Sequence, residues 1–565
     1  MDGAPAAARP WLRHYGPRVP TDALAPEAPV DVLFERSAQR FPERAALVFR
    51  GRSLTYAQLA AEVARAAAGL ARLGVGPGTR VAVHLPNLPQ SVVAVLATLR
   101  LGGDVVMTNP LYVARELVHQ WHDAEVQVAV TGSWLWAGTL AALRAELPAR
   151  HYVIAQIPDY LPFPQRLLAP FALRKRGLHV RVPEGDGVLS WRTLVREGVH
   201  APRHRNAFDE VALLQYTGGT TGVSKGVMLT HGNLASQVRQ LRTWMTPLED
   251  GREAVLAALP YFHVFGFVGA MLLPLSMGAT IVLMPDPRDI GEMIGLVERH
   301  RISMFPAVPT QFTAINQFPG IERRDVSSVR VCVSGSAPLP EDTLRRFEEL
   351  TGARICEGFG MTESSPCTHC NPVDGLRKIG SIGVPLPGTD ARIVDPDDGV
   401  TDRAAGEPGE LIVRGPQVMR GYWRRDDATA ETVRDGWLYT GDLAVMDDDG
   451  FFRIVGRKKD LILCSGYNVY PDEIDRVLCD HAAVAEACSI GVPHPKRGES
   501  VKSFVVLTPG ASATPEELVA HCRANLAAYK VPAEIELRAS LPKSAVMKLL
   551  RRELRDEELR RRGLA

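Results

Sequence analysis

The chain has 565 residues, of which 46% are hydrophobic and 23% are charged, and its formal net charge at pH 7 is +1. A chain of this length exceeds what one hydrophobic core usually supports, so at least two domains are expected. The near-zero net charge excludes a global field that would draw the protein to nucleic acid or to an acidic partner. Any binding specificity must therefore come from local sites.

The two ends of the chain and its eight cysteines indicate the cellular location of the protein. Residues 1–16 lack the apolar core of a signal peptide, and the final residues, RRRGLA, match no peroxisomal signal. Eight cysteines in a chain of this length are typical of free thiols rather than of a disulfide framework. We therefore expect a cytoplasmic, reducing location.

Strand-like and helix-like segments alternate over the first two-thirds of the sequence. A helix is predicted from Tyr56 to Leu73, and Thr55 with Gln58 three residues later forms a capping box at its start. The next strand, helix and strand are expected at 80–85, 89–101 and 104–107. This order is typical of a βαβ unit. The predicted fold class is α/β, with a large N-terminal domain of parallel-type sheets layered with helices.

Residues 161–182 mix apolar and basic side chains. The apolar ones are Phe163, Leu167, Leu168, Phe171 and Leu173, and the basic ones are Arg166, Arg174, Lys175 and Arg176. A segment of this composition is suited to lie on an anionic membrane. An amphipathic helix that packs on its own protein has the same composition, so contact with a membrane stays a hypothesis.

The segment 216–226, with the sequence YTGGTTGVSKG, follows an apolar run at 211–214 that is typical of a buried strand. Glycines let backbone N–H groups converge on one anion without collisions of Cβ atoms. Hydroxyl groups add donors, and a lysine adds the positive charge that suits a polyphosphate. The segment therefore predicts a phosphate-binding loop. Its contributing residues are Thr217, Gly218, Gly219, Thr220, Thr221, Gly222, Ser224 and Lys225.

The nearest alternative is the loop of P-loop NTPases, in which glycine precedes the lysine and serine or threonine follows it. In this chain Ser224 precedes Lys225, and Gly226 follows it. The P-loop interpretation therefore fails on both sides of the lysine.

Residues 254–285 carry no formal charge, and a run of this length is sufficient to span a bilayer. Pro260, His263 and Pro274 interrupt the run, and residues 279–283 have the composition of a buried strand. We therefore predict a buried helix followed by a buried strand rather than a membrane span.

Cys367 and Cys370 flank His369 in the sequence CTHC. This is the inner spacing of a zinc site, but the sequence places no second pair of ligands to complete a tetrahedral shell. We therefore favour a loop that contains thiols over a metal site.

Near Gly456 the sequence changes to short strands and single helices. Helix starts are indicated by Pro471, which can occupy a first helical position, and by the capping box of Thr514 and Glu517. We predict that residues 1–456 form the large domain and that residues 457–565 form a small α+β domain.

The phosphate-binding segment and four later blocks resemble, in order, the signature sequences of the adenylate-forming superfamily. This superfamily includes acyl-CoA ligases, luciferases and peptide-synthetase adenylation domains. The blocks are GFGMTE at 358–363, GWLYTGD at 436–442, GRKKDLILCSGYNVYP at 456–471 and LPKSAVMKLLRREL at 541–554. The resemblance covers nearly the whole chain and is strongest to bacterial long-chain fatty acid CoA ligases.

The resemblance implies a reaction in two steps. A carboxylate attacks the α-phosphate of ATP to give an acyl adenylate, and a thiol then opens the adenylate. Thr217 and Glu363 are implied to hold Mg²⁺ on the phosphates, with oxygen ligands that suit a hard cation. Asp442 is implied to accept from both ribose hydroxyls, and Arg457 to reach the ribose or a phosphate. The implied contacts with adenine and phosphate are Gly358, Phe359, Gly360, Met361 and Thr362.

The resemblance also implies that the small domain is a mobile lid that rotates between the two steps. Lys548 is implied as the catalytic lysine that neutralises the α-phosphate, and Lys459 as the hinge. Gly466 is implied to line the channel for the pantetheine of CoA. The chain departs from the family at Met547, where glycine usually precedes the lysine, and at Phe359, where tyrosine is frequent.

The acid to be activated is indicated by the segment PYFHVFG at 260–266. The segment lacks the aspartate with which amino-acid-activating relatives bind an ammonium group, so an acid with a neutral tail is favoured. His263 resembles the histidine near the reacting carboxylate, although an isolated histidine among aromatic residues is more often structural. Together with 334–340, the segment resembles the wall of an acyl tunnel, in which each buried CH₂ contributes about 0.8 kcal/mol.

We therefore expect an ATP-dependent ligase that converts a long-chain fatty acid to its CoA thioester and releases AMP and pyrophosphate. A ligase for medium-chain or aromatic acids is the alternative within this class. The alternative outside the ligase class is a protein that binds a nucleotide and an acyl group but has lost turnover. This alternative stays open because Met547 departs from the family pattern next to the catalytic lysine. The expected partners are a fatty acid, ATP and CoA, with no nucleic acid. An anionic membrane and a second copy of the chain are left open as partners.

Overall fold

A computed structural model of the chain describes residues 9–22, 25–196, 203–217, 224–464, 467–495, 497–543 and 549–564. These residues fall into two compact units. The larger unit comprises Leu12–Asp390 and Arg414–Gly436. The smaller unit comprises three stretches of the chain, namely the described residues up to Trp11, Ala391–Val413, and the described residues from Trp437 to the end. The predicted domain boundary between residues 456 and 457 stays a prediction.

The first sheet of the larger unit has a parallel centre and antiparallel edges. In spatial order it contains β16 (Val384–Pro385), β15 (His369–Cys370), β14 (Arg354–Phe359), β13 (Val331–Ser334), β12 (Met304–Ala307), β10 (Ala254–Ala257), β11 (Thr280–Leu283), β1 (Ala45–Phe49) and β2 (Arg52–Thr55). The pairs from β14 to β1 are parallel, whereas β2 and β15 pair antiparallel with their neighbours.

The second sheet of the larger unit is built in the same way. Its order is β19 (Gly421–Tyr422), β9 (Lys225–Thr230), β8 (Val211–Thr217), β4 (Asp104–Met107), β3 (Arg80–His84), β5 (Val128–Gly132), β6 (His151–Ala155) and β7 (Val188–Ser190). The strands from β8 to β7 pair in parallel, and β9 and β19 continue the sheet antiparallel. β19 thus brings a segment from residue 421 beside the strand that follows the predicted phosphate loop.

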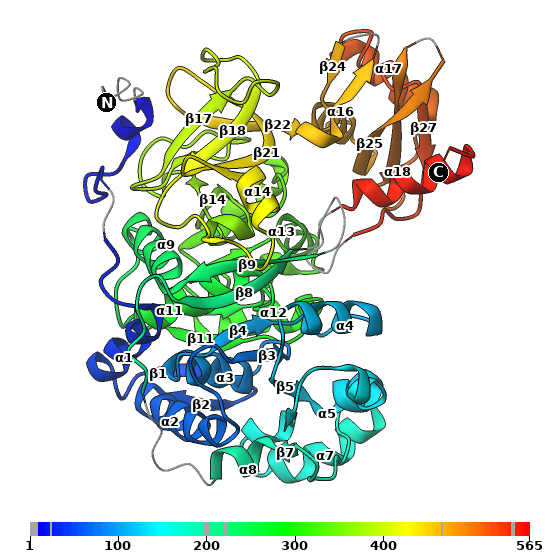
Figure 1. Ribbon diagram of the computed structural model, residues 1–565. Helices are drawn as coiled ribbons and strands as arrows, with labels where there is room; N and C mark the ends of the chain where they lie inside the picture. Colours follow the sequence, from blue (N-terminus) through cyan, green and yellow to red (C-terminus); the bar gives the residue numbers. More distant parts are fainter. Residues whose placement is uncertain are drawn as a thin grey trace. The chain divides into compact units, whose positions relative to one another are not determined.

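Helices lie between the two sheets of the larger unit (Figure 1). α2 (Tyr56–Arg72) contacts β1 and α3 (Pro89–Arg100), and α3 in turn contacts β3 and β4. α9 (His231–Trp244) contacts β9 and α11 (Leu273–Ser276), which packs on β11. The predicted α/β class with layered helices and sheets is confirmed.

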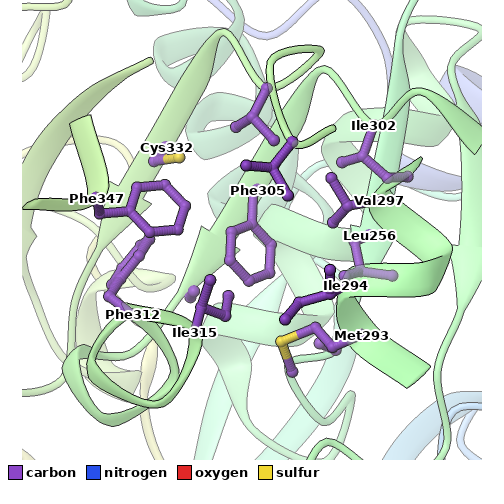
Figure 2. Close-up of a cluster of buried hydrophobic side chains, with 14 of the residues drawn as sticks. Leu256, Met293, Ile294, Val297, Ile302, Phe305, Phe312, Ile315, Cys332 and Phe347 are labelled. Carbon is purple, nitrogen blue, oxygen red and sulfur yellow. The ribbon is translucent and has the colours of Figure 1, made fainter. Parts of the chain in front are cut away.

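A buried cluster fixes further helices to the first sheet, as Figure 2 shows. The helices are α12 (Ile290–His300), α13 (Pro309–Asn316) and α14 (Glu341–Thr351). Phe305 of β12 lies with its ring centroid 5.7 Å from that of Phe312 on α13, and Phe312 lies 4.9 Å from Phe347 on α14. Leu256 of β10 and Ile294 of α12 complete the same core. The strands that precede the predicted site segments are therefore anchored in a packed interior.

Several local predictions for the larger unit are confirmed. Thr55 and Gln58 form both hydrogen bonds of the capping box that opens α2. β3, α3 and β4 form the predicted βαβ unit, with β3 and β4 parallel. Within the uncharged run at 254–285, α10 (Val264–Phe267), the π-helical turn η5 (Val268–Leu272) and α11 form one continuous buried helical stretch, and the buried strand β11 follows it, as predicted. Within the described part of the chain, no helix has both the length and the apolar character needed to cross a membrane.

The CTHC segment differs in one respect from the predicted loop. His369 and Cys370 form the short strand β15, which pairs with Gly358 and Phe359 at the end of β14. The segment is strand rather than loop because it supplies the edge partner that β14 needs. All eight cysteines are free, and the described residues contain no group of three metal-ligating side chains.

The smaller unit contains two sheets of its own. The first includes β17 (Asp390–Val394), β18 (Gly409–Arg414), β21 (Trp437–Met446) and β22 (Phe452–Arg457). The second contains β24 (Tyr467–Val469), β23 (Ile462–Cys464), β26 (Gly498–Leu507), β25 (Val484–His494) and β27 (Glu534–Leu537). Its helices are α16 (Pro471–Cys479), α17 (Pro515–Asn525) and α18 (Arg551–Arg561). Pro471 opens α16, and Thr514 caps α17 with Glu517, as predicted.

Candidate active site

The described ends of the predicted phosphate loop lie on a β-hairpin. Thr217 is the last residue of β8 and pairs with Lys225, the first residue of β9. The Ser224 hydroxyl donates a hydrogen bond to the carbonyl of Thr217, which closes the hairpin from one side. Gly218, Gly219, Thr220, Thr221 and Gly222 lie outside the described residues. The hairpin therefore fixes Thr217 and Lys225 opposite one another.

Glu363 lies close to this hairpin because a tyrosine joins the two. Glu363 is buried in the short helix η7 (Thr362–Ser364). The hydroxyl of Tyr422 donates to Glu363 Oε1 at 2.7 Å, and Lys225 Nζ lies 4.9 Å from the centre of the Tyr422 ring. Tyr422 belongs to β19 and pairs with Val227 of β9. Burial, together with the Glu363 carboxylate, raises the pKa of the Tyr422 phenol, so the hydroxyl stays protonated and can donate.

Tyr422 is a functional candidate that the sequence reasoning did not identify. It stands in the sequence GYW at 421–423, next to a glycine with a φ of 151° whose Cβ position lies 2.7 Å from the Thr429 side chain. The only feature of the sequence that could have identified Tyr422 is an aromatic residue directly after a glycine. The signal is weak because only the pairing of β19 with β9 brings Tyr422 to Glu363.

The GFGMTE segment changes from strand to a tight turn. β14 ends at Phe359, whose ring lies 6.2 Å from that of His369 on β15. A Cβ atom on Gly360 would lie 1.7 Å from the carbonyl oxygen of Pro366, so only glycine fits there. Met361 N then donates to the Ser364 hydroxyl at 3.0 Å and holds η7 closed. The turn at Gly360 and the short helix together direct Glu363 into the interior.

The segment 260–266 is held in place by a buried amide. Gln215 of β8 donates from Nε2 to the carbonyl of Phe262 at 2.5 Å. His263 begins the short helix α10 (Val264–Phe267), where its Nδ1 accepts from Phe265 N at 3.3 Å. A Cβ on Gly266 would lie 2.2 Å from the carbonyl oxygen of Pro260. His263 therefore has a capping role in the structure, in addition to the role near the carboxylate that the resemblance implies.

The predicted acyl-pocket segments adjoin the nucleotide segment. A Cβ placed on Gly335 would lie 3.2 Å from the ring of Phe265 and 3.6 Å from the carbonyl oxygen of Gly358. The segments at 260–266, 334–340 and 358–363 therefore meet near Gly335. The carboxyl ends of β10, β13 and β14, which precede these segments, are the usual place for ligands in parallel sheets.

In the smaller unit, Asp442 and Arg457 are cross-strand neighbours on β21 and β22. Asp442 is buried, and Arg457 Nε lies 2.9 Å from its Oδ1. Asp442 N donates to the Thr440 hydroxyl at 3.1 Å, and that hydroxyl donates to the carbonyl of Leu411 at 2.7 Å. Asp442 is thus a buried carboxylate whose orientation is fixed by Arg457 and by the Thr440 turn.

Lys459 follows directly in the helical turn η8 (Lys458–Asp460). Partial desolvation and the charge of Arg457 lower its pKa, against the opposing charges of Asp460 and Asp442. Gly466, Met547 and Lys548 lie outside the described residues, so their predicted roles stay predictions. Lys543 and Leu549 form an antiparallel bridge at the two ends of the segment that carries Lys548.

The residues of the larger unit fit a magnesium site of the usual kind. Mg²⁺ is generally bound by one or two carboxylates together with substrate phosphates and water rather than by a cage of protein ligands. Glu363 supplies a buried carboxylate whose orientation Tyr422 fixes, and Thr217 supplies a hydroxyl.

Comparisons with known proteins now identify the family. A model of the AMP-binding enzyme family matches residues 34–423, and a model of the AMP-binding enzyme C-terminal domain matches residues 473–548. The chain belongs to the AMP-binding enzyme family. The predicted class, an adenylate-forming ligase, is confirmed by this membership.

Relatives and solved structures of the family agree with this assignment. A long-chain-fatty-acid–CoA ligase of Bacillus subtilis (strain 168) is 41% identical over 556 residues, which cover 97% of this chain and 98% of that protein. ATP-bound MatB from Rhodopseudomonas palustris has a TM-score of 0.82 at 30% identity and covers 93% of this chain and 98% of its own. O-succinylbenzoate Coenzyme A synthetase from Bacillus subtilis, in complex with ATP and magnesium ion, has a TM-score of 0.76 at 28% identity, covering 93% and 99%.

Proposed function

We propose that the protein activates a long-chain fatty acid with ATP and Mg²⁺ through an acyl adenylate, joins it to CoA, and releases AMP and pyrophosphate. The observation that carries the proposal is the arrangement of Lys225, Tyr422 and Glu363 beside the glycine-rich hairpin. The fatty acid is supported by the Bacillus subtilis ligase, which is similar over nearly the whole of both chains.

Each group of residues has a proposed task in the first half-reaction. Thr217 and Glu363 hold the magnesium ion, which supplies charge neutralisation on the phosphates when bound. Lys225, with the loop that follows Thr217, binds the phosphates themselves. Phe359 stacks on adenine, and the remaining contacts come from Gly358, Gly360, Met361 and Thr362.

The smaller unit has its own proposed tasks. Asp442 accepts hydrogen bonds from the ribose hydroxyls, and Arg457 holds its carboxylate in place. Lys548 neutralises the α-phosphate during adenylation. Rotation about Lys459 then offers Gly466 and its neighbours to CoA for the second half-reaction.

The acyl chain is proposed to lie along the segments at 260–266 and 334–340. Phe262 and Phe265, with Phe267 directly after the first segment, make this region apolar, and the resemblance implies that His263 acts near the reacting carboxylate. Each methylene that the region buries contributes about 0.8 kcal/mol to binding. Affinity is therefore expected to rise with chain length.

A panel of acids tests the proposal. The purified protein receives ATP, Mg²⁺ and CoA with palmitate, oleate, decanoate, cinnamate or benzoate, and AMP, pyrophosphate and thioester are measured. The highest kcat/KM is expected for palmitate and oleate. If only cinnamate were turned over, the substrate would be an aromatic acid rather than a fatty acid. Nucleotide binding without pyrophosphate release would show that the protein binds its ligands but is not a ligase.

The location and partners follow from this chemistry. We propose a cytoplasmic enzyme that meets its acid at the inner face of the cell membrane, because long-chain fatty acids partition into bilayers. A homodimer stays a prediction that sedimentation of the purified protein would test.

A further inference from the structure

One helix of the larger unit exposes large apolar side chains. α7 (Gln165–Lys175) lies at the periphery of this unit (Figure 1). Phe163, just before the helix, is 81% exposed, and Leu167, Leu168 and Phe171 on the helix are 61%, 64% and 68% exposed. Exposure of this extent at four neighbouring large side chains is unusual for a surface that faces only water.

Leu167, Leu168 and Phe171 share one side of α7, while the other side is packed. Leu167 and Phe171 are four residues apart, and Leu168 and Phe171 are three apart, so they are neighbours on the helix surface. Leu173 is only 8% exposed, and α7 contacts the short helix η4 (Ile157–Tyr160) of its own unit. The helix is therefore anchored through an inner face and presents a separate apolar face outward.

Basic side chains surround this apolar face without acidic partners. Residues 161–183 contain no aspartate or glutamate. The exposed basic residues are Arg166, Arg174, Lys175, Arg176 and Arg181, and within the described ranges none of the five forms an ion pair with an acidic residue. The flanking acidic side chains are engaged elsewhere, since Asp159 pairs with Arg192 at 2.6 Å and Glu184 accepts from Thr193.

We propose that residues 163–181, the α7 surface, dock the enzyme on an anionic lipid bilayer. The exposed apolar side chains of this surface match the acyl boundary of such a bilayer, and its rim of unpaired basic groups matches the anionic headgroups. The inference deepens the proposed function, because the membrane would be the source of the fatty acid. An acidic protein surface would satisfy the basic rim but would leave four large apolar side chains without the deep apolar layer that a bilayer offers.

The experiment measures co-sedimentation of the full-length protein with vesicles. One set contains phosphatidylglycerol mixed with phosphatidylcholine, and the other contains phosphatidylcholine alone. We expect binding to the anionic vesicles that weakens as salt is raised, and little binding to the neutral ones.

Two sets of variants locate the surface. The double variant Leu167→Ser with Phe171→Ser removes apolar area, and its matched control is Leu376→Ser with Val400→Ser, which are exposed elsewhere. The triple variant Arg174→Gln, Lys175→Gln and Arg176→Gln removes charge, and its control is Arg299→Gln, Arg323→Gln and Arg523→Gln, three basic residues that are exposed elsewhere. We expect about a hundredfold weaker partitioning for the charge variant, at about one kcal/mol per basic residue, and unchanged partitioning for both controls.

The outcomes separate this inference from the proposed function. Ligase activity on decanoate without vesicles is expected to be unchanged in all variants, because none of the altered residues belongs to the candidate active site. Equal vesicle binding by the α7 variants and their controls would overturn the proposal, as would no binding at all. Loss of a dimer in the α7 double variant, with no vesicle binding by the parent, would assign the surface to a second copy instead.

Discussion

The candidate active site and the α7 surface are opposite kinds of functional region. Around Glu363 the side chains are buried, paired and held in one geometry by Tyr422 and the β8–β9 hairpin. On α7 the side chains are exposed, and among the described residues the basic ones form no ion pairs. Chemistry at phosphorus needs groups that are fixed before the reaction, whereas adsorption to a bilayer needs summed area and charge. Single substitutions should therefore be severe in the first region and mild in the second.

Replacement of Lys548 is expected to have the largest effect. Lys548→Ala removes the positive charge proposed for the α-phosphate, so pyrophosphate release should fall by roughly 10²–10³-fold. Thioester formation from a supplied acyl adenylate and CoA should change far less, and stopped-flow measurement of the two half-reactions checks this. An equal fall in the rates of both half-reactions would show that Lys548 does not act specifically in adenylation.

Replacement of Glu363 should follow closely. Glu363→Gln keeps the shape of the side chain and an acceptor for Tyr422 but loses the negative charge that is proposed to hold the magnesium ion. We expect kcat/KM for ATP to fall by about a hundredfold and half-saturation to need a higher Mg²⁺ concentration. Binding of a fluorescent ATP analogue at increasing Mg²⁺ gives a readout besides turnover. A variant with unchanged Mg²⁺ dependence would show that Glu363 is only structural.

Tyr422→Phe tests whether the orientation of Glu363 matters. A hydrogen bond to a charged group is worth about 1.5–3 kcal/mol, so we expect roughly a tenfold or greater fall in kcat/KM, with a matching shift in Mg²⁺ dependence. Tyr439→Phe is the matched control, because the Tyr439 hydroxyl donates to the backbone carbonyl of Gly399 instead. A similar loss in both variants would assign Tyr422 to stability alone.

Asp442→Asn should have a smaller effect. The amide keeps only one acceptor oxygen, so the KM for ATP should rise by about tenfold while the KM for CoA stays the same. Steady-state kinetics with each substrate varied in turn measure both values. A rise confined to the KM for CoA would contradict the assignment of Asp442 to ribose.

A single substitution on α7 should have the smallest effect. Leu168→Ser removes one of four exposed apolar side chains, so partitioning onto anionic vesicles should weaken by only a few-fold. Co-sedimentation measures this change. A complete loss of binding from this one substitution would mean that the surface is a specific pocket rather than an additive patch.

Sequence reasoning predicted the features that depend on local order. The capping box of Thr55 and Gln58, the βαβ unit at 80–107 and the helix start at Pro471 each rest on a few neighbouring residues, and each is confirmed. The strand at His369 was missed because its formation depends on the edge of β14.

Tyr422 was missed for the same physical reason. It lies 59 residues after Glu363, and only the pairing of β19 with β9 brings the two side chains together. The resemblance to a family supplied the residues that are proposed to contact ligands, such as Glu363 and Asp442. It did not supply the residues that hold them, because those roles depend on tertiary contacts.

The most direct test of the central claim is detection of the acyl adenylate itself. The protein is incubated with oleate, ATP and Mg²⁺ without CoA, and the bound products are analysed by mass spectrometry. The account predicts oleoyl-AMP together with an equal amount of pyrophosphate, and conversion to oleoyl-CoA when CoA is added. Bound ATP with neither oleoyl-AMP nor pyrophosphate would contradict it.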